Sequence, residues 1–294
     1  MKKVLTIGMF MVMGSLFVSG ISPYIRITDL PGSMDDAAEK VISVLSDEGY
    51  EIIGKYHPGR DPDLYVVVFT NEKIKTLCKG SKDRGMLAAA MKVGFQRKEG
   101  KINVTLLNPE YLFYAYFRDK MNEPSFKSSA LAISSEIKSS VRGVGTTMQP
   151  FGGDLSIKDL IKYHYMVGMP HFDDPVKLAE FDNFKHGLTT IRKNLSANSN
   201  TLKVYEIIDE QNNIAVFGMG LPDKEEGEAH FLPIIGESHV AAMPYEIILQ
   251  NKKATMLHGR YRFALHWPEL TMKTFTKIMS SPGDVEDAMK ALMK

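Results

Sequence analysis

Cysteine is almost absent from this chain of 294 residues, which contains only Cys78. A single thiol cannot form an intrachain disulfide, and cysteine-rich zinc or redox motifs are excluded. Lys75 and Lys79 flank this thiol and could lower its pKa, but a half-buried residue on a helix is the simpler interpretation. The sequence therefore predicts neither a disulfide scaffold nor thiol chemistry.

An excess of positive charge is also absent. The chain has 36 Lys and Arg residues against 35 Asp and Glu residues. Removal of residues 1–20 would take away Lys2 and Lys3 and leave a net charge near −1. A phosphate backbone is bound mainly by a surplus of basic side chains, so we expect no nucleic-acid partner.

Long apolar runs are absent after residue 21. Near the start, Lys2 and Lys3 precede a run of apolar and small residues from Val4 to Val18, and Val18-Ser19-Gly20 ends in small residues. A basic start, an apolar stretch and a final group of small residues are typical of a secretory signal peptide, so residues 1–20 predict export to the periplasm. The alternative is that residues 4–21 stay uncleaved as an inner-membrane anchor, because a span needs about 20 apolar residues.

The rest of the chain is interpreted as two α+β units, at residues 21–142 and 158–294, joined by a glycine-rich linker at 143–157. Each unit has a pattern of strand–helix–strand–strand–helix–strand–strand–helix. This order predicts a two-layer domain, with helices on one face of an antiparallel sheet. The other face would be left for solvent, a ligand or the second unit, and pairing two units would protect it.

Short matches support a tandem duplication. In the second unit we expect strands at 161–168 and 254–267, a helix at 175–195 and a last helix starting at Pro268. The matches are Ala89-Ala90-Met91 with Ala241-Ala242-Met243, Pro109-Glu110 with Pro268-Glu269, and Phe117, Met121 and Pro124 with Phe275, Met279 and Pro282.

The stretches "MPYEIIL" at 243–249 and "INVTLLNP" at 102–109 resemble a bacterial family described as domain of unknown function 302. Its members have an "LPCNVVV"-like strand, a short turn and a strand ending in Asp/Asn-Pro. The resemblance implies a fold of the TATA-binding-protein class and no established activity. Met91 and Tyr245 stand where the family usually has cysteine, so no thiol role is implied.

A cationic stripe is the first candidate site. If 257–267 is a strand, the alternation places His258, Arg260, Arg262 and His266 on one face. The planar guanidinium group of arginine can donate two hydrogen bonds to a carboxylate, a phosphate or a sulfur oxyanion. The alternative is an ordinary solvated sheet face. We therefore expect a non-enzymatic binding or assembly module whose second unit binds a small anionic ligand or a protein partner, without a cofactor.

A second candidate uses His164 and His171 as metal ligands. Met166 and Met169 lie between them, and imidazole with thioether suits copper in an exported protein. An extended strand would hold the two histidines up to about 20 Å apart, unless the chain turns at Pro170. The alternative function is thus a copper or zinc protein, or an enzyme that uses the histidines of the second unit. In the competing interpretation the two histidines are ordinary polar residues of the surface and the methionines fill the core.

Overall fold

The computed structural model describes residues 20–294, so the predicted signal peptide lies, except for Gly20, outside the described residues. The first sheet is antiparallel and draws its strands from the first half of the chain. Its strand order is β2 (Glu51–Tyr56), β3 (Leu64–Thr70), β4 (Met91–Lys98), β5 (Lys101–Leu107), β1 (Tyr24–Leu30) and β6 (Gln149–Phe151).

The second sheet is also antiparallel. Its strand order is β8 (Leu202–Asp209), β9 (Ile214–Gly220), β10 (Tyr245–Gln250), β11 (Lys253–Met256) and β7 (Val176–Glu180). Apart from β6, the two sheets have the same order, with β7 in the place of β1 and β8 in the place of β2. The predicted α+β class with two antiparallel sheets is confirmed.

Ten α-helices connect and cover the strands within residues 20–294. They are α1 (Met34–Asp47), α2 (Glu72–Lys79), α3 (Pro109–Phe117), α4 (Pro124–Ser140), α5 (Ile157–Ile161), α6 (Phe184–Ala197), α7 (Glu228–Ile235), α8 (Gly259–His266), α9 (Met272–Phe275) and α10 (Ser281–Ala291). Local sequence explains where the long outer helices begin. Ser33 and Asp36 form a capping box on α1, and the Asn183 side chain accepts from the His186 amide at the start of α6.

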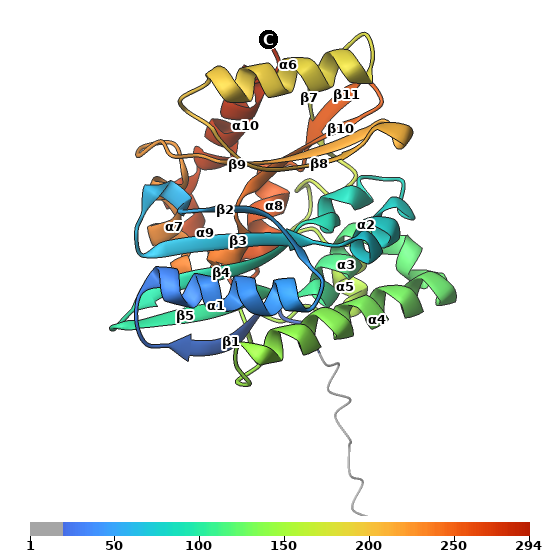
Figure 1. Cartoon of the computed structure of the whole chain (residues 1–294). Coiled ribbons are helices and arrows are strands. Elements are labelled where there is room, and N and C mark those ends of the chain that lie inside the picture. Colours follow the sequence, from blue (N-terminus) through green and yellow to red (C-terminus); the bar gives the residue numbers. More distant parts are fainter. Residues whose placement is uncertain (1–19) are drawn as a thin grey trace, which may run out of the picture.

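The sheets and helices form layers, with the two sheets in the middle (Figure 1). Helix α1 packs on β2, β3 and β4, and its buried face includes Ala38, Val41 and Leu45. Helix α6 packs on β8, β10 and β11 and buries Leu188 and Ile191. Because each long helix covers the outer face of its sheet, the inner faces of the two sheets are left to meet each other.

Two short 3₁₀ helices fill the space between the sheets. The first, η2 (Gly85–Ala89), packs on β9 and β10, and the second, η6 (Glu237–Ala242), packs on β3, β4 and β5. The contact with β4 requires a glycine, because a Cβ on Gly94 would lie 2.6 Å from the Ala241 backbone nitrogen. Each half of the chain therefore inserts a short helix against the sheet of the other half.

Two predictions in the second half are wrong in position. Residues 161–168 do not form a strand, since α5 ends at Ile161 and turns follow. Residues 176–180 form strand β7 and not the beginning of a helix, which starts only at Phe184. The short apolar pattern of 175–181 fits either structure, and its antiparallel pairing with β11, Val176 opposite Met256, decides for the strand.

Of the strand predicted at 254–267, residues 254–256 do lie in β11, but residues 259–266 form helix α8. Residues Tyr261 to His266 are buried on all sides, so the helix has no polar face to reveal a period of 3.6 residues. Pro268 begins no helix, since the last helix, α10, starts at Ser281, so the proposed match between Pro109 and Pro268 is not a structural one. The helix that corresponds in order to α8 is α3, which Pro109 does begin, as predicted.

The segment predicted as a plain linker, 143–157, contains strand β6, whose residue Phe151 pairs with Tyr24 of β1. Its end also carries an isolated bridge between Leu155 and Ile21. Within residues 20–294, no helix combines the length and the apolar character needed to span a bilayer.

Candidate functional site

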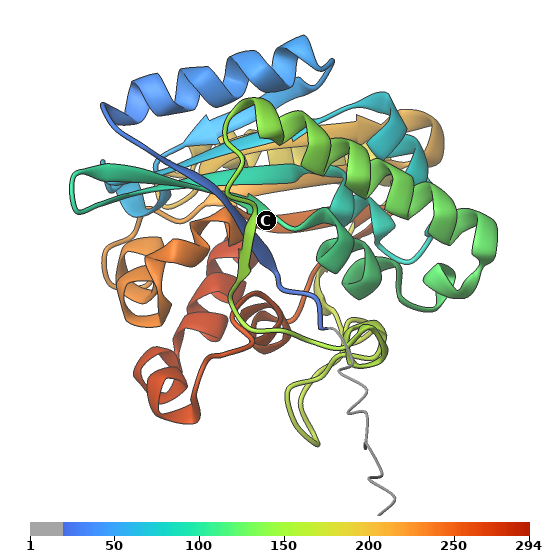
Figure 2. The same cartoon turned by 90° about the horizontal axis from the view of Figure 1, so that it is seen from below.

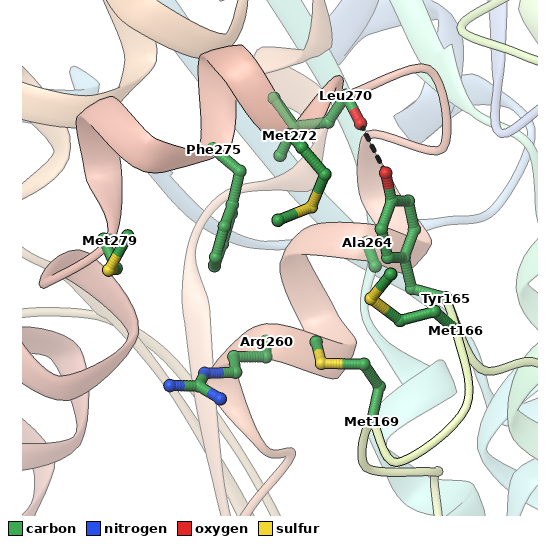
Figure 3. Close-up of a pocket in the computed structure, with 9 residues that line it drawn as sticks. All are labelled: Tyr165, Met166, Met169, Arg260, Ala264, Leu270, Met272, Phe275 and Met279. Carbon is green, nitrogen blue, oxygen red and sulfur yellow. Dashed lines mark hydrogen bonds between the residues drawn. The ribbon is translucent and has the colours of Figure 1, made fainter.

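A cavity of about 230 Å³ opens at one end of α8, between this helix, the segment from α9 to Met279 and the loop 165–169. Its wall is mostly apolar and rich in methionine. The lining residues are Tyr165, Met166, Met169, Arg260, Ala264, Leu270, Met272, Phe275 and Met279. Figure 3 shows Phe275, Met272, Tyr165 and the two loop methionines around one common space, with Arg260 beside it. We refer to this cavity as the methionine pocket.

The pocket is shaped by a tether between two separate segments. The Tyr165 hydroxyl donates to the Leu270 carbonyl oxygen at 3.3 Å, which joins the loop to the segment before α9 (Figure 3). Ala264 on α8 presents only a methyl group at the inner wall, so space remains there. Met166, Met272 and Met279 are 47%, 49% and 56% exposed, so the apolar wall continues to the molecular surface.

Arg260 is the cationic group of the methionine pocket. It is exposed on α8, and no carboxylate in residues 20–294 forms an ion pair with it. Its guanidinium lies at the margin of the pocket, on the side away from Tyr165 (Figure 3). Glu269 is the only carboxylate in the sequence from Met256 to Gly283. The pocket therefore combines an apolar wall with one positive charge that lacks a carboxylate partner in the described chain.

Arg262, the second predicted anion ligand, is buried between the sheets. Its guanidinium donates to the Pro244 carbonyl oxygen at 2.8 Å and to Glu246 Oε2 at 3.4 Å, and it lies 3.8 Å from the Tyr245 ring centre. Glu246 also forms a buried ion pair with Lys92 of the first sheet. Although burial opposes its charge, the Glu246 carboxylate raises the pKa of Arg262. This cation joins the two sheets and is not exposed.

The two predicted histidines of this group have different positions. His258 is the N-cap of α8, and its Nδ1 accepts from the Arg260 amide at 3.2 Å. His266 is buried at the end of the helix, 3.4 Å from the Tyr116 hydroxyl, and burial with the nearby Arg262 charge lowers the pKa of its imidazole well below the usual value. The four predicted residues therefore do not form one stripe, and only Arg260 reaches the methionine pocket.

His164 and His171, the predicted metal ligands, do come together. Their ring centres are 4.5 Å apart, because the chain turns at Gly168, which has φ +81°, and the Met169 amide donates to the Met166 carbonyl oxygen. Within residues 20–294, no group of three or more His, Cys, Asp or Glu side chains is arranged to hold a metal ion. The pair lies on the same loop that gives Met166 and Met169 to the pocket.

The interface between the two halves contains a carboxylate that sequence reasoning missed. Glu228 is fully buried, accepts from the Tyr56 hydroxyl at 2.8 Å and accepts from the Gly59 amide at 2.9 Å. Burial raises the pKa of Glu228 to about 7, and the two hydrogen bonds only partly offset this effect. No pattern around residue 228 marks it, because both partners lie about 170 residues earlier in the chain.

The far wall of the methionine pocket was also missed. Leu270, Met272 and Phe275 stand in "ELTMKTF", where the sequence predicted a helix with no special surface. Two methionines and a phenylalanine are exposed or half-exposed within eight residues of this segment. Large apolar residues rarely gather on a protein surface, so this cluster is the signal that could have identified the wall.

Comparisons with known proteins add little about function. No protein-family model matches the chain, and no curated protein matches it either. Among solved structures, an uncharacterized conserved DUF302 protein from Bacillus stearothermophilus matches 41% of this chain and 97% of its own length, with 16% identity and a TM-score of 0.34. A likeness at this level leaves the function to be argued from the residues themselves.

Proposed function

We propose that the chain is an exported, non-enzymatic binding module made of two DUF302-like repeats, and that its second repeat binds a small apolar carboxylate. The observation that carries this proposal is the methionine pocket, an apolar cavity with the Arg260 cation at its margin and no carboxylate paired with that cation in the described chain. The apolar residues 4–18 support export, and a balanced charge argues against nucleic acid.

The tandem repeat rests on more than the order of strands. Helices α1 and α6 begin 150 residues apart, at Met34 and Phe184. The helices α3 and α8 keep the same spacing, since Asn108 and His258 are their N-caps. The starts of the matching strands lie between 150 residues apart, for β3 and β9, and 154 residues apart, for β4 and β10. Such a nearly constant offset is what duplication of one unit would produce.

The ligand class follows from size, wall chemistry and charge. A cavity of about 150 Å³ holds benzene, so 230 Å³ accommodates a tail of about ten non-hydrogen atoms. Methionine side chains are flexible and polarizable, so the wall can adapt to acyl or aromatic groups. Arg260 suits a carboxylate at the pocket margin, where its planar fork can donate two hydrogen bonds. A fatty or aromatic monocarboxylate meets all three conditions.

Calorimetric titration with octanoate, octanol and acetate tests the proposal. Octanoate is expected to bind most tightly, octanol more weakly because it lacks the charge, and acetate not measurably because it lacks the tail. Absence of binding by both eight-carbon probes would show that the pocket holds no such ligand. Equal binding of octanoate and octanol would remove the anion from the proposal.

Substitutions test the contributions of the apolar wall and of the Arg260 charge to ligand binding separately. Arg260→Met is expected to weaken octanoate about tenfold, which corresponds to about 1.4 kcal/mol, and to leave octanol unchanged. Ala264→Phe is expected to abolish binding of both probes by filling the inner wall. Arg142→Met is the matched control, because Arg142 is an exposed arginine of the first repeat.

A copper or zinc site remains the second candidate, favoured by the 4.5 Å separation of the His164 and His171 rings. Titration with Cu(II), Cu(I) and Zn(II), followed by metal analysis after dialysis, tests it. One equivalent retained by the protein and lost in His164→Ala and His171→Ala would support a metal site. Retention that is unchanged in both variants would assign the metal to another place.

A further inference from the structure

An apolar surface surrounds the mouth of the methionine pocket. Val167 at the tip of the loop is 95% exposed, and Met166, Met272 and Met279 are each about half exposed. We call these four residues the apolar rim. They come from two segments that lie on either side of the same pocket, so they gather on one surface. Exposed apolar side chains are ordinary when single, but a cluster of them marks an interaction surface.

Basic side chains accompany the apolar rim. Lys162 precedes the loop, and Lys273 and Lys277 alternate with the rim methionines of the second segment. All three are exposed, and none forms an ion pair within the described part of the chain. With Arg260 of α8, these lysines make four cations that form no ion pair with a carboxylate in the described part of the chain.

Three carboxylates lie in the same segments of the chain. Asp173 accepts from Arg118 at 3.1 Å, and Asp174 accepts from the His171 amide at 2.9 Å. Glu269 lies 3.5 Å from His239 Nε2. None of these three carboxylates forms an ion pair with Arg260, Lys273 or Lys277.

We propose that the apolar rim docks on an anionic lipid surface. Apolar side chains would enter the boundary between headgroups and acyl chains, while Lys273 and Lys277 would meet the lipid phosphates. Peripheral membrane attachment uses this combination of apolar insertion and basic charge. The surface stands independently of the pocket ligand, although a pocket that opens within it would face the bilayer.

Charge and chain position favour lipid over a second copy or another protein. An anionic bilayer presents negative charge over its whole surface, whereas the surface of this nearly neutral chain carries charge of both signs. The described chain begins at Gly20, beside the segment that leads into the loop, because Ile21 forms a bridge with Leu155. Figure 2 shows this beginning of the chain next to the yellow-green loops. The apolar residues 4–18 directly precede this point.

Binding of the full chain to vesicles tests the charge and the rim together. Vesicles of phosphatidylglycerol with phosphatidylcholine are compared with pure phosphatidylcholine. Val167→Asp with Met272→Asp is expected to weaken binding to the anionic vesicles at least tenfold. Lys273→Glu with Lys277→Glu is expected to weaken it about fivefold for each lysine at low salt. Lys98→Glu with Lys101→Glu, in the exposed hairpin between β4 and β5, is the matched charge control.

A label that reports how deeply the rim enters the bilayer tests rim docking apart from any membrane binding by residues 1–19. Cys78 is fully buried, so Val167→Cys supplies the accessible thiol for an environment-sensitive fluorophore. On anionic vesicles the label is expected to shift to the blue and to be quenched by brominated lipid. A label at Leu202→Cys, another exposed apolar position outside the rim, is expected to do neither.

Three results would overturn the proposal. The first is equal vesicle binding by wild type and by the Val167→Asp/Met272→Asp variant, with native thermal unfolding of both. The second is a Val167 label that stays exposed to water on anionic vesicles. The third is a dimer of the full chain, seen by analytical ultracentrifugation and lost in the same variant, which would assign the rim to a second copy.

Discussion

Glu228 shows how one residue connects the two halves of the molecule. Its carboxyl oxygens accept from Tyr56 and Gly59, which both belong to the first half. A buried carboxyl is more easily kept neutral than ionised, because burial removes the water that would solvate its charge. The protonation of Glu228 is therefore coupled to the packing of the two halves.

The pH dependence of stability tests this residue. The pKa of Glu228 is raised to about 7 in the folded chain, so folding holds its proton more tightly than the unfolded chain does. Its contribution is complete below about pH 4.5 and is lost as pH rises through 7, by about 3 kcal/mol. Urea unfolding of wild type and Glu228→Gln at several pH values measures the difference. A difference that stays constant from pH 4.5 to 7.5 would contradict the shift.

Helix α8 is the element that most changes the interpretation of the sequence. It places Arg260 at the pocket and Arg262 in the core, since residues two apart on a helix point about 200° around the axis from each other. On a strand both would share one face. Its N-cap, His258, corresponds in position to Asn108 of α3, which accepts from the Glu110 amide.

Substitution of the N-cap residue therefore tests the start of α8 directly. His258→Ala is expected to cost about 1 kcal/mol of unfolding free energy, because the Arg260 amide loses its partner. His258→Asn is expected to retain the stability of wild type, since Asn108 already serves as the N-cap of α3. Thermal and urea unfolding measure both. Equal destabilisation by Ala and Asn would show that packing of the imidazole, rather than capping, is what matters.

At the scale of the whole molecule, the two sheets depend on close contact of their inner faces. The buried cations Lys92 and Arg262 share the carboxylate of Glu246, so removal of Glu246 would leave both cations without a carboxylate partner. Around this cluster, the backbones approach so closely that Gly94 has no space for a side chain. The interface is therefore specific in shape as well as in charge.

Gly94→Ala tests that close approach. The added methyl group would meet the Ala241 backbone at 2.6 Å, so we expect a loss of about 1–3 kcal/mol. Gly283→Ala is the matched control: a Cβ there meets nothing within 4 Å in the described structure, and alanine in helix α10 is expected to be neutral or stabilising by up to about 1 kcal/mol. Equal effects of the two substitutions would mean that the sheets can separate enough to admit the methyl group.

The sequence by itself determined the fold class and much of the first half of the chain. Ser33 before α1, the β-branched residues at 64–70 and Pro109 at the start of α3 are local signals, because a cap, β-branching and a proline at a helix start act on the nearby backbone alone. Only the tertiary structure decided the site. Residues 257–267 lie in a helix without a polar face, and the pocket joins Arg260 to a loop almost 100 residues earlier. Neither burial on all sides nor contact between distant segments leaves a periodic trace in the sequence, because both arise only when the layers pack together.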